Sequence, residues 1–105
     1  MLFFFNIDMY RECFDIIASK LDEDSLFRLG VKLNLPYKDV DKIVDRGNST
    51  YHKTCLILML WRDQCGQQAD LNQIVEILKE MNKVAIAKNL LKSFIHHRGY
   101  HNQYY

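Results

Sequence analysis

The residues of this sequence best able to do chemistry are its histidines and cysteines. His96, His97 and His101 stand close together, and with Cys65 they could bind a transition metal such as zinc. They lie in a polar stretch without a Cys-x-x-Cys pair, which leaves the geometry of a tetrahedral site undefined. The sequence therefore predicts no metal site and no bound cofactor.

A cysteine nucleophile is the second chemistry to weigh. His52 precedes Cys55 by three residues, so in a helix the two side chains would share a face. Catalysis requires a thiolate, however, and Cys55 belongs to an apolar run where burial would raise its pKa. The four glycines are scattered and form no phosphate-binding loop. We expect no catalytic residue and no small-molecule substrate, and hence no enzyme.

Composition and charge describe one small globular domain. The chain has 105 residues, of which 49% are hydrophobic and one is proline, so it can bury a core. Its 14 basic and 13 acidic residues give a net charge of +1, which argues against binding a phosphate backbone. Three cysteines without paired spacing favour a reducing compartment over a disulfide scaffold.

The apolar start of the chain raises the question of targeting. Met1 to Phe5 are apolar, but this run stops at Asn6 with neither the basic leader nor the cleavage site of a secretory signal. No stretch reaches the ~20 apolar residues of a membrane-spanning helix. We therefore expect a cytoplasmic protein without membrane insertion. Phe3, Phe4 and Phe5 could pack on the domain or serve another contact, and both alternatives stay open.

Apolar residues recur at three- and four-residue spacing along most of the chain, which is typical of helices with one buried face. With short links between them, such helices predict an all-α fold, a compact antiparallel six-helix bundle. We place a single domain at residues 1–95 and expect a flexible C-terminal tail at 96–105. The expected helices lie at about 8–21, 26–33, 36–46, 51–65, 71–81 and 83–94.

Several residues predict where helices begin, end or approach one another. Asn48 to Thr50 and Asp70 are typical N-caps, and we also expect Asn82 to cap the last helix. Gly47 is placed to end the third helix. Gly30 stands inside the second helix, where glycine is unfavourable, so we expect a neighbouring helix to approach it closely.

The segment LFRLGVKLNL at 26–35 is followed by Val40 and Ile43 in the next expected helix. These segments resemble the death domain, the six-helix interaction module of apoptotic and inflammatory signalling. The first is similar to the family pattern W-x-x-L-A-x-x-L-G-L, and Val40 with Ile43 matches the family's next helix. Trp61, Gly66 and Ala69 follow in the family's order, which is similar to that in adaptors that recruit caspases. The resemblance covers about residues 14–92 and implies the family's Greek-key bundle.

The sequence departs from the family pattern at three positions, where Leu26, Gly30 and Asn34 replace the usual Trp, Ala and Gly. The related death-effector and caspase-recruitment domains share the bundle and stay open as alternatives. A death-fold segment of a larger receptor or kinase is a further alternative.

The resemblance implies homotypic binding to other death-fold domains through asymmetric contacts between charged surfaces. Acids concentrate in the first four helices and bases in the last two, which suits head-to-tail stacking and open assemblies. The third helix would face an acidic corner on a neighbouring copy, and the end of the fourth helix would face a basic corner. The expected contacts are Lys38, Asp39, Asp41, Lys42, Asp45 and Arg46 against Asp22, Glu23 and Asp24, and Arg62, Asp63 and Gln64 against Lys79 and Lys83.

A helical nucleic-acid-binding domain is the remaining alternative. Lys79, Lys83 and two further lysines could form a basic stripe, but Glu76 and Glu80 interrupt it. No helix carries the cluster of Arg, Asn and Gln that reads base edges. We therefore expect no nucleic-acid partner.

Overall fold

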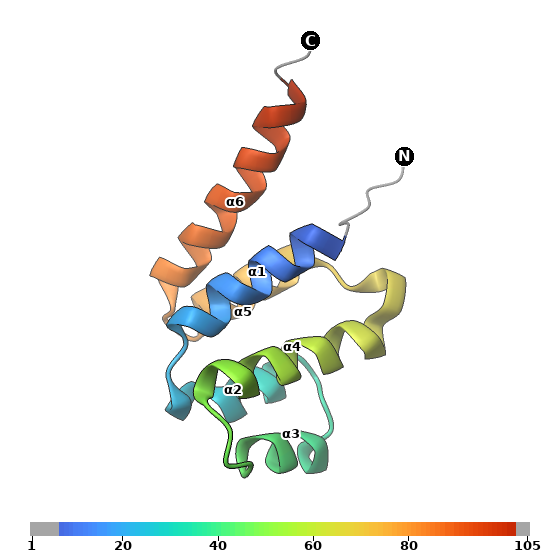
Figure 1. Cartoon of the computed structure of the whole chain (residues 1–105), viewed down its shortest axis with the longest axis vertical. Coiled ribbons are helices and arrows are strands. Elements are labelled where there is room, and N and C mark those ends of the chain that lie inside the picture. Colours follow the sequence, from blue (N-terminus) through green and yellow to red (C-terminus); the bar gives the residue numbers. More distant parts are fainter. Residues whose placement is uncertain (1–6, 103–105) are drawn as a thin grey trace.

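The computed structural model describes the backbone of residues 7–102 and the side chains of residues 9–95. Phe3, Phe4 and Phe5 lie outside the described residues. Residues 7–102 contain helices and links without a strand, so the fold is the expected all-α six-helix bundle (Figure 1). The helices are α1 (Ile7–Lys20), η1 (a 3₁₀ turn, Glu23–Ser25), α2 (Leu26–Lys32), α3 (Tyr37–Val44), α4 (Thr50–Cys65), η2 (a 3₁₀ turn, Gly66–Gln68), α5 (Leu71–Glu80) and α6 (Val84–Asn102).

One hydrophobic core joins all six α-helices. α1 packs against α4 and α6, α5 against α6, and α2 against α3 and α4. In Figure 1, α3 lies at one end of the bundle, and α6 extends past the other helices at the opposite end. Each helix supplies at least one fully buried apolar side chain, and these include Ile17, Leu29, Val40, Trp61, Leu78 and Ala87.

Two of the predicted N-caps are confirmed. The Ser49 side chain accepts a hydrogen bond from the His52 N–H at 3.1 Å, and the Asp70 side chain accepts one from the Asn72 N–H at 2.9 Å. Each satisfies an N–H group that the first helical turn leaves without a partner. These caps fix where α4 and α5 begin.

Two other predicted helix ends are wrong. Asn82 does not cap α6, because it lies past the end of α5 with φ of 63°. The Lys83 N–H donates to the Leu78 carbonyl at 2.8 Å, which closes a Schellman motif around this left-handed residue. Gly47 has no positive φ and is not the left-handed end of α3. That helix ends at Val44 through an Arg46 N–H bond to the Ile43 carbonyl.

The boundary expected between residues 95 and 96 does not interrupt the secondary structure. α6 continues to Asn102, so seven residues of the expected tail are helical. The sequence contains no apolar periodicity there, but helical backbone bonds do not depend on a buried face. The domain assignment to residues 1–95 therefore stays a prediction, without a helix end to mark it.

Candidate docking surface

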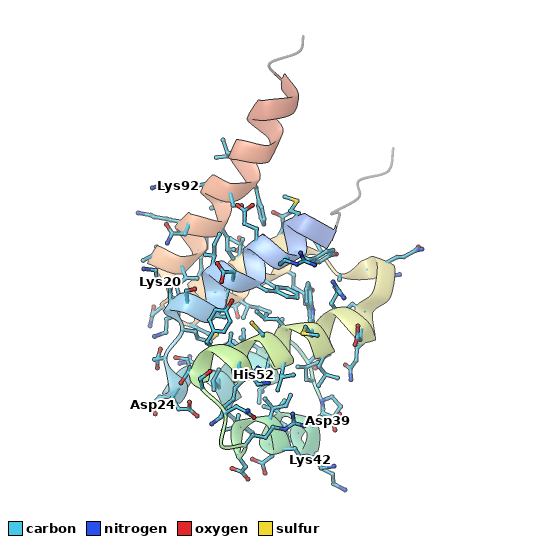
Figure 2. All side chains as sticks on the ribbon, in the orientation of Figure 1. Lys20, Asp24, Asp39, Lys42, His52 and Lys92 are labelled. Atoms are coloured by element: carbon cyan, nitrogen blue, oxygen red, sulfur yellow. The ribbon has the colours of Figure 1, made fainter. Side chains whose placement is uncertain are left out.

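α3 carries a dense set of charges at one end of the bundle. Lys38, Asp41, Lys42, Asp45 and Arg46 are exposed, and we call them the charged α3 face. None of the five forms an ion pair or side-chain hydrogen bond with a described side chain. Asp39, also expected at the site, is half-buried beside them. Figure 2 shows Asp39 and Lys42 at this end of the molecule.

The charged α3 face has an internal order. Lys38 and Lys42 lie one turn apart in α3 and begin a basic row that Arg46 continues past the end of the helix. Asp41 and Asp45, the C-cap residue, form an acidic row beside it. Like charges one turn apart destabilise a helix by a few tenths of a kcal/mol per pair. A partner that presents both signs would relieve this repulsion, so the face is suited to docking against a mixed-charge surface.

The expected acidic corner, Asp22 to Asp24, is largely engaged within the molecule. Asp22 Oδ1 accepts hydrogen bonds from Lys83 Nζ at 2.6 Å and from Ser25 Oγ at 2.8 Å. These bonds, that from Lys83 above all, hold the pKa of Asp22 below its usual range. Asp24 alone of the three is exposed without a polar partner among the described side chains.

The acidic corner and the basic corner are therefore neighbours in one molecule, joined by the Asp22–Lys83 ion pair. We expected each corner to face a neighbouring copy, but Asp22 and Lys83 face each other within one molecule. Lys79 also has an internal partner, because its ammonium group lies 3.3 Å from Glu76 one turn earlier in α5. Both basic residues can still face a neighbour, but their charges are partly neutralised.

Lys53 is the residue of this region that sequence reasoning missed. Only 7% of it is exposed, and its Nζ donates to Glu23 Oε2 at 2.9 Å and to the Val44 carbonyl oxygen at 2.8 Å. Glu23 Oε1 accepts a further bond from Thr50 Oγ1 at 2.7 Å. These bonds, first that from Thr50 and then that from Lys53, lower the pKa of Glu23. The sequence did indicate that Lys53 could be buried, since it precedes Ile57 by one helical turn and therefore lies on the same face of α4.

The end of α4 forms the other expected contact region. Asp63 and Gln64 are exposed, while the half-buried Arg62 places its guanidinium 5.5 Å from the centre of the Tyr10 ring. The Tyr10 hydroxyl donates to the Ala69 carbonyl at 2.8 Å, and burial raises its pKa. The cation–π contact fixes Arg62 against α1, which leaves Asp63 and Gln64 as the accessible polar groups here.

An exposed aromatic pair joins α2 and α3 and was also missed. Phe27 is 38% exposed and Tyr37 is 65% exposed, with ring centroids 5.6 Å apart. Exposed aromatic side chains are enriched in protein interfaces, so this pair extends the charged α3 face with apolar area. Each residue lies outside the apolar repeat of its helix, and this position in the sequence indicates an exposed ring.

The Cys55 region differs from the expectation in one respect. Cys55 is half-buried and not part of the core, and burial raises the pKa of its thiol. Next to it, the Tyr51 hydroxyl donates to Asp15 Oδ1 at 2.6 Å, which raises the pKa of Tyr51 to about 12. Among the side chains of residues 9–95, no three His, Cys, Asp or Glu residues gather as metal ligands would. His96, His97 and His101 lie beyond that range.

Acidification tests the engagement of the acidic corner. Since folding lowers the pKa values of Asp22 and Glu23, their ion pairs stabilise the fold above the ordinary carboxyl pKa of about 4 and lose this effect below it. We expect the unfolding temperature of Glu23→Gln to lie below that of the wild type at neutral pH and to approach it at about pH 3. Thermal unfolding followed by circular dichroism across this pH range measures the difference. Asp24→Asn is the control, and an equal pH dependence of Glu23→Gln and Asp24→Asn would contradict the assignment.

These features define an all-α bundle that presents charged and aromatic surface groups at one end and has no catalytic constellation among its described residues. A family model for the death domain matches residues 11–94, and the chain belongs to the death domain family. No curated protein and no solved structure matches the chain. Death domains are interaction modules that bind other death-fold domains. Within the described residues, no helix is long and apolar enough to cross a membrane.

Proposed function

We propose that this death domain is a non-enzymatic adaptor module that binds other death-fold domains homotypically and assembles apoptotic or inflammatory signalling complexes in the cytoplasm. The observation that supports this most directly is the charged α3 face. Its five exposed charges have no partner among the described side chains, although like charges stand one turn apart. Surface charges contribute little to stability on their own, whereas complementary charges across an interface steer and orient docking.

The proposed docking is head to tail. The charged α3 face of one copy meets the corner that carries Asp24 on the next, and Asp63 with Gln64 meets the Lys79 region of another. Asp22 and Glu23 contribute to docking indirectly, because their ion pairs within the molecule hold the corner in place. Such heterologous contacts do not close on themselves, so several weak contacts together stabilise an open assembly.

The lysines expected to form a basic stripe do not favour nucleic-acid binding. Lys79 is paired with Glu76 and Lys83 with Asp22, so two cations of the expected stripe already have carboxylate partners. A phosphate backbone would have to displace both. The death-fold segment of a larger receptor, a kinase, or a death-effector or caspase-recruitment protein would use the same surface.

Light scattering against protein concentration and salt tests the proposal on the purified chain. We expect the wild type to form large assemblies that dissociate as salt rises, because exposed charge pairs are screened. Lys42→Glu should weaken association roughly tenfold or more, since it reverses a charge in the basic row and repels Asp24 on the partner. Asp63→Lys should do the same at the end of α4, because it places a positive charge against the Lys79 region of the partner.

Lys92→Glu is the matched control, because it reverses an exposed charge on α6, away from the charged α3 face. Circular dichroism must stay helical in all three variants. If the wild type remains monomeric at every concentration, or if all three reversals weaken association equally, the proposed homotypic docking is wrong.

A further inference from the structure

Lys53 is a buried charge in a place where an apolar side chain would serve stability as well. It follows Ser49 in the first turns of α4 and precedes the fully buried Ile57 and Trp61 on the same side of the helix. Burial of an ammonium group is costly unless it is paired, and replacing a buried ion pair by apolar residues is often neutral or stabilising. Stability alone therefore does not account for a lysine here.

The partners of Lys53 come from two other elements. Glu23 belongs to η1, the turn that carries Asp24, and the Val44 carbonyl is at the end of α3, next to Asp45. Thr50 adds a second bond to Glu23 from the start of α4. We call Lys53 with Glu23, Thr50 and the Val44 carbonyl the Lys53 clamp. It links directly the two segments that bear the proposed docking charges.

We propose that Lys53 is a positioning residue for docking: it does not touch the partner, but fixes the Asp24 corner relative to the charged α3 face so that both surfaces engage in one geometry. This inference rests on the proposed function. Two surfaces held in a fixed relation engage partners with less loss of conformational freedom than two that move separately.

The hydrogen bonds of Lys53 support a positioning role, because they join its ammonium group to two other elements. The ammonium group is a strong donor whose partners, a carboxylate and a carbonyl at a helix C-terminus, both favour a positive charge. Its side chain is 9% exposed and that of Glu23 is 47% exposed, so the clamp spans from the core to the surface. A methionine could fill the buried part of this space but would bind neither oxygen.

The test compares Lys53→Met with the wild type and with Lys20→Met, which removes the charge of an exposed lysine on α1. Hydrogen exchange of the monomer at residues 22–25 and 44–46 reports whether the segments are held. We expect faster exchange there in Lys53→Met and no change in Lys20→Met, at a temperature where circular dichroism shows all three folded. Glu23→Gln keeps the size of the side chain but loses its charge and one of its two accepting oxygens, and it provides a second variant if Lys53→Met does not fold.

Self-association of double variants distinguishes a positioning role of Lys53 from a role in stability alone. Asp24→Asn should weaken association in the wild-type background and have little further effect in the Lys53→Met background, because the corner is no longer held in place. Lys53→Met alone should weaken association roughly tenfold. If Asp24→Asn lowers association by the same factor in both backgrounds, Lys53 is not a positioning residue.

The two levels of the inference fail separately. A wild type that never associates overturns the proposed function, while the exchange rates still decide whether Lys53 holds the corner. Unchanged exchange at residues 22–25 in both Lys53→Met and Glu23→Gln would overturn the positioning role even in a chain that assembles.

Discussion

Replacing Trp61 with alanine is expected to lower the free energy of unfolding by about 3–5 kcal/mol, the range measured for large aromatic residues in cores. Trp61 is fully buried in α4 and belongs to the one hydrophobic cluster that all the α-helices share. Removing the indole leaves a cavity that helices packed on several sides cannot close. Because a domain of this size is stabilised by only about 5–15 kcal/mol, this loss is a large fraction of the total and should lower the unfolding temperature by many degrees.

Trp61→Phe is the matched control for this prediction. The indole Nε1 has no hydrogen-bond partner among the described residues, and a buried N–H without one costs about 1–3 kcal/mol. Phenylalanine removes this unpaired donor while it retains an aromatic ring, so we expect a loss of only about 1–2 kcal/mol. Chemical and thermal unfolding followed by circular dichroism measure both. Equal losses in the two variants would show that indole volume does not determine the stability of this core.

The helices could be predicted from the sequence because the information is local. Apolar residues at helical spacing mark the buried faces of α4 and α5, and Ser49 and Asp70 cap these helices within three residues. Such signals need no knowledge of the tertiary fold. Asn82 shows the limit, since one asparagine between two helices can end the first or begin the second. The choice depends on whether it adopts positive φ.

The candidate site was less predictable because charges acquire their roles from distant partners. Asp22 and Lys83 are 61 residues apart in the chain, and Lys53 and Glu23 are 30 apart. Sequence reasoning treats each side chain as solvated, so it assigned Asp22 and Lys83 to contacts with neighbouring copies and not to each other. The charged α3 face was predictable, since its residues flank an apolar edge of only Val40, Ile43 and Val44. The exposure of Phe27 and Tyr37 was also predictable, but their contact was not, because it forms only once α2 and α3 pack together.

α3 approaches α2 closely at Gly30, as the position of this glycine inside α2 predicted. A Cβ atom added at Gly30 would lie 2.7 Å from both methyl carbons of Val40, closer than van der Waals contact allows. Val40 is fully buried, and its branched side chain has few alternative rotamers, so it cannot move aside easily. A side chain at this position therefore pushes α3, and with it the charged α3 face, away from the bundle.

The clash in Gly30→Ala is consequently expected to destabilise the fold by about 1–3 kcal/mol. The higher helix propensity of alanine offsets up to about 1 kcal/mol of this loss. Gly30→Val should cost more, because its branches add to the same clash. Val40→Ala alone leaves a cavity and costs about 2 kcal/mol. The double variant Gly30→Ala/Val40→Ala should be more stable than the sum of the single losses by about 1 kcal/mol or more, since the new methyl group occupies the space that Val40 vacates. Unfolding curves of the four proteins measure this coupling energy, and strictly additive losses would mean that α2 and α3 can separate at this contact without strain.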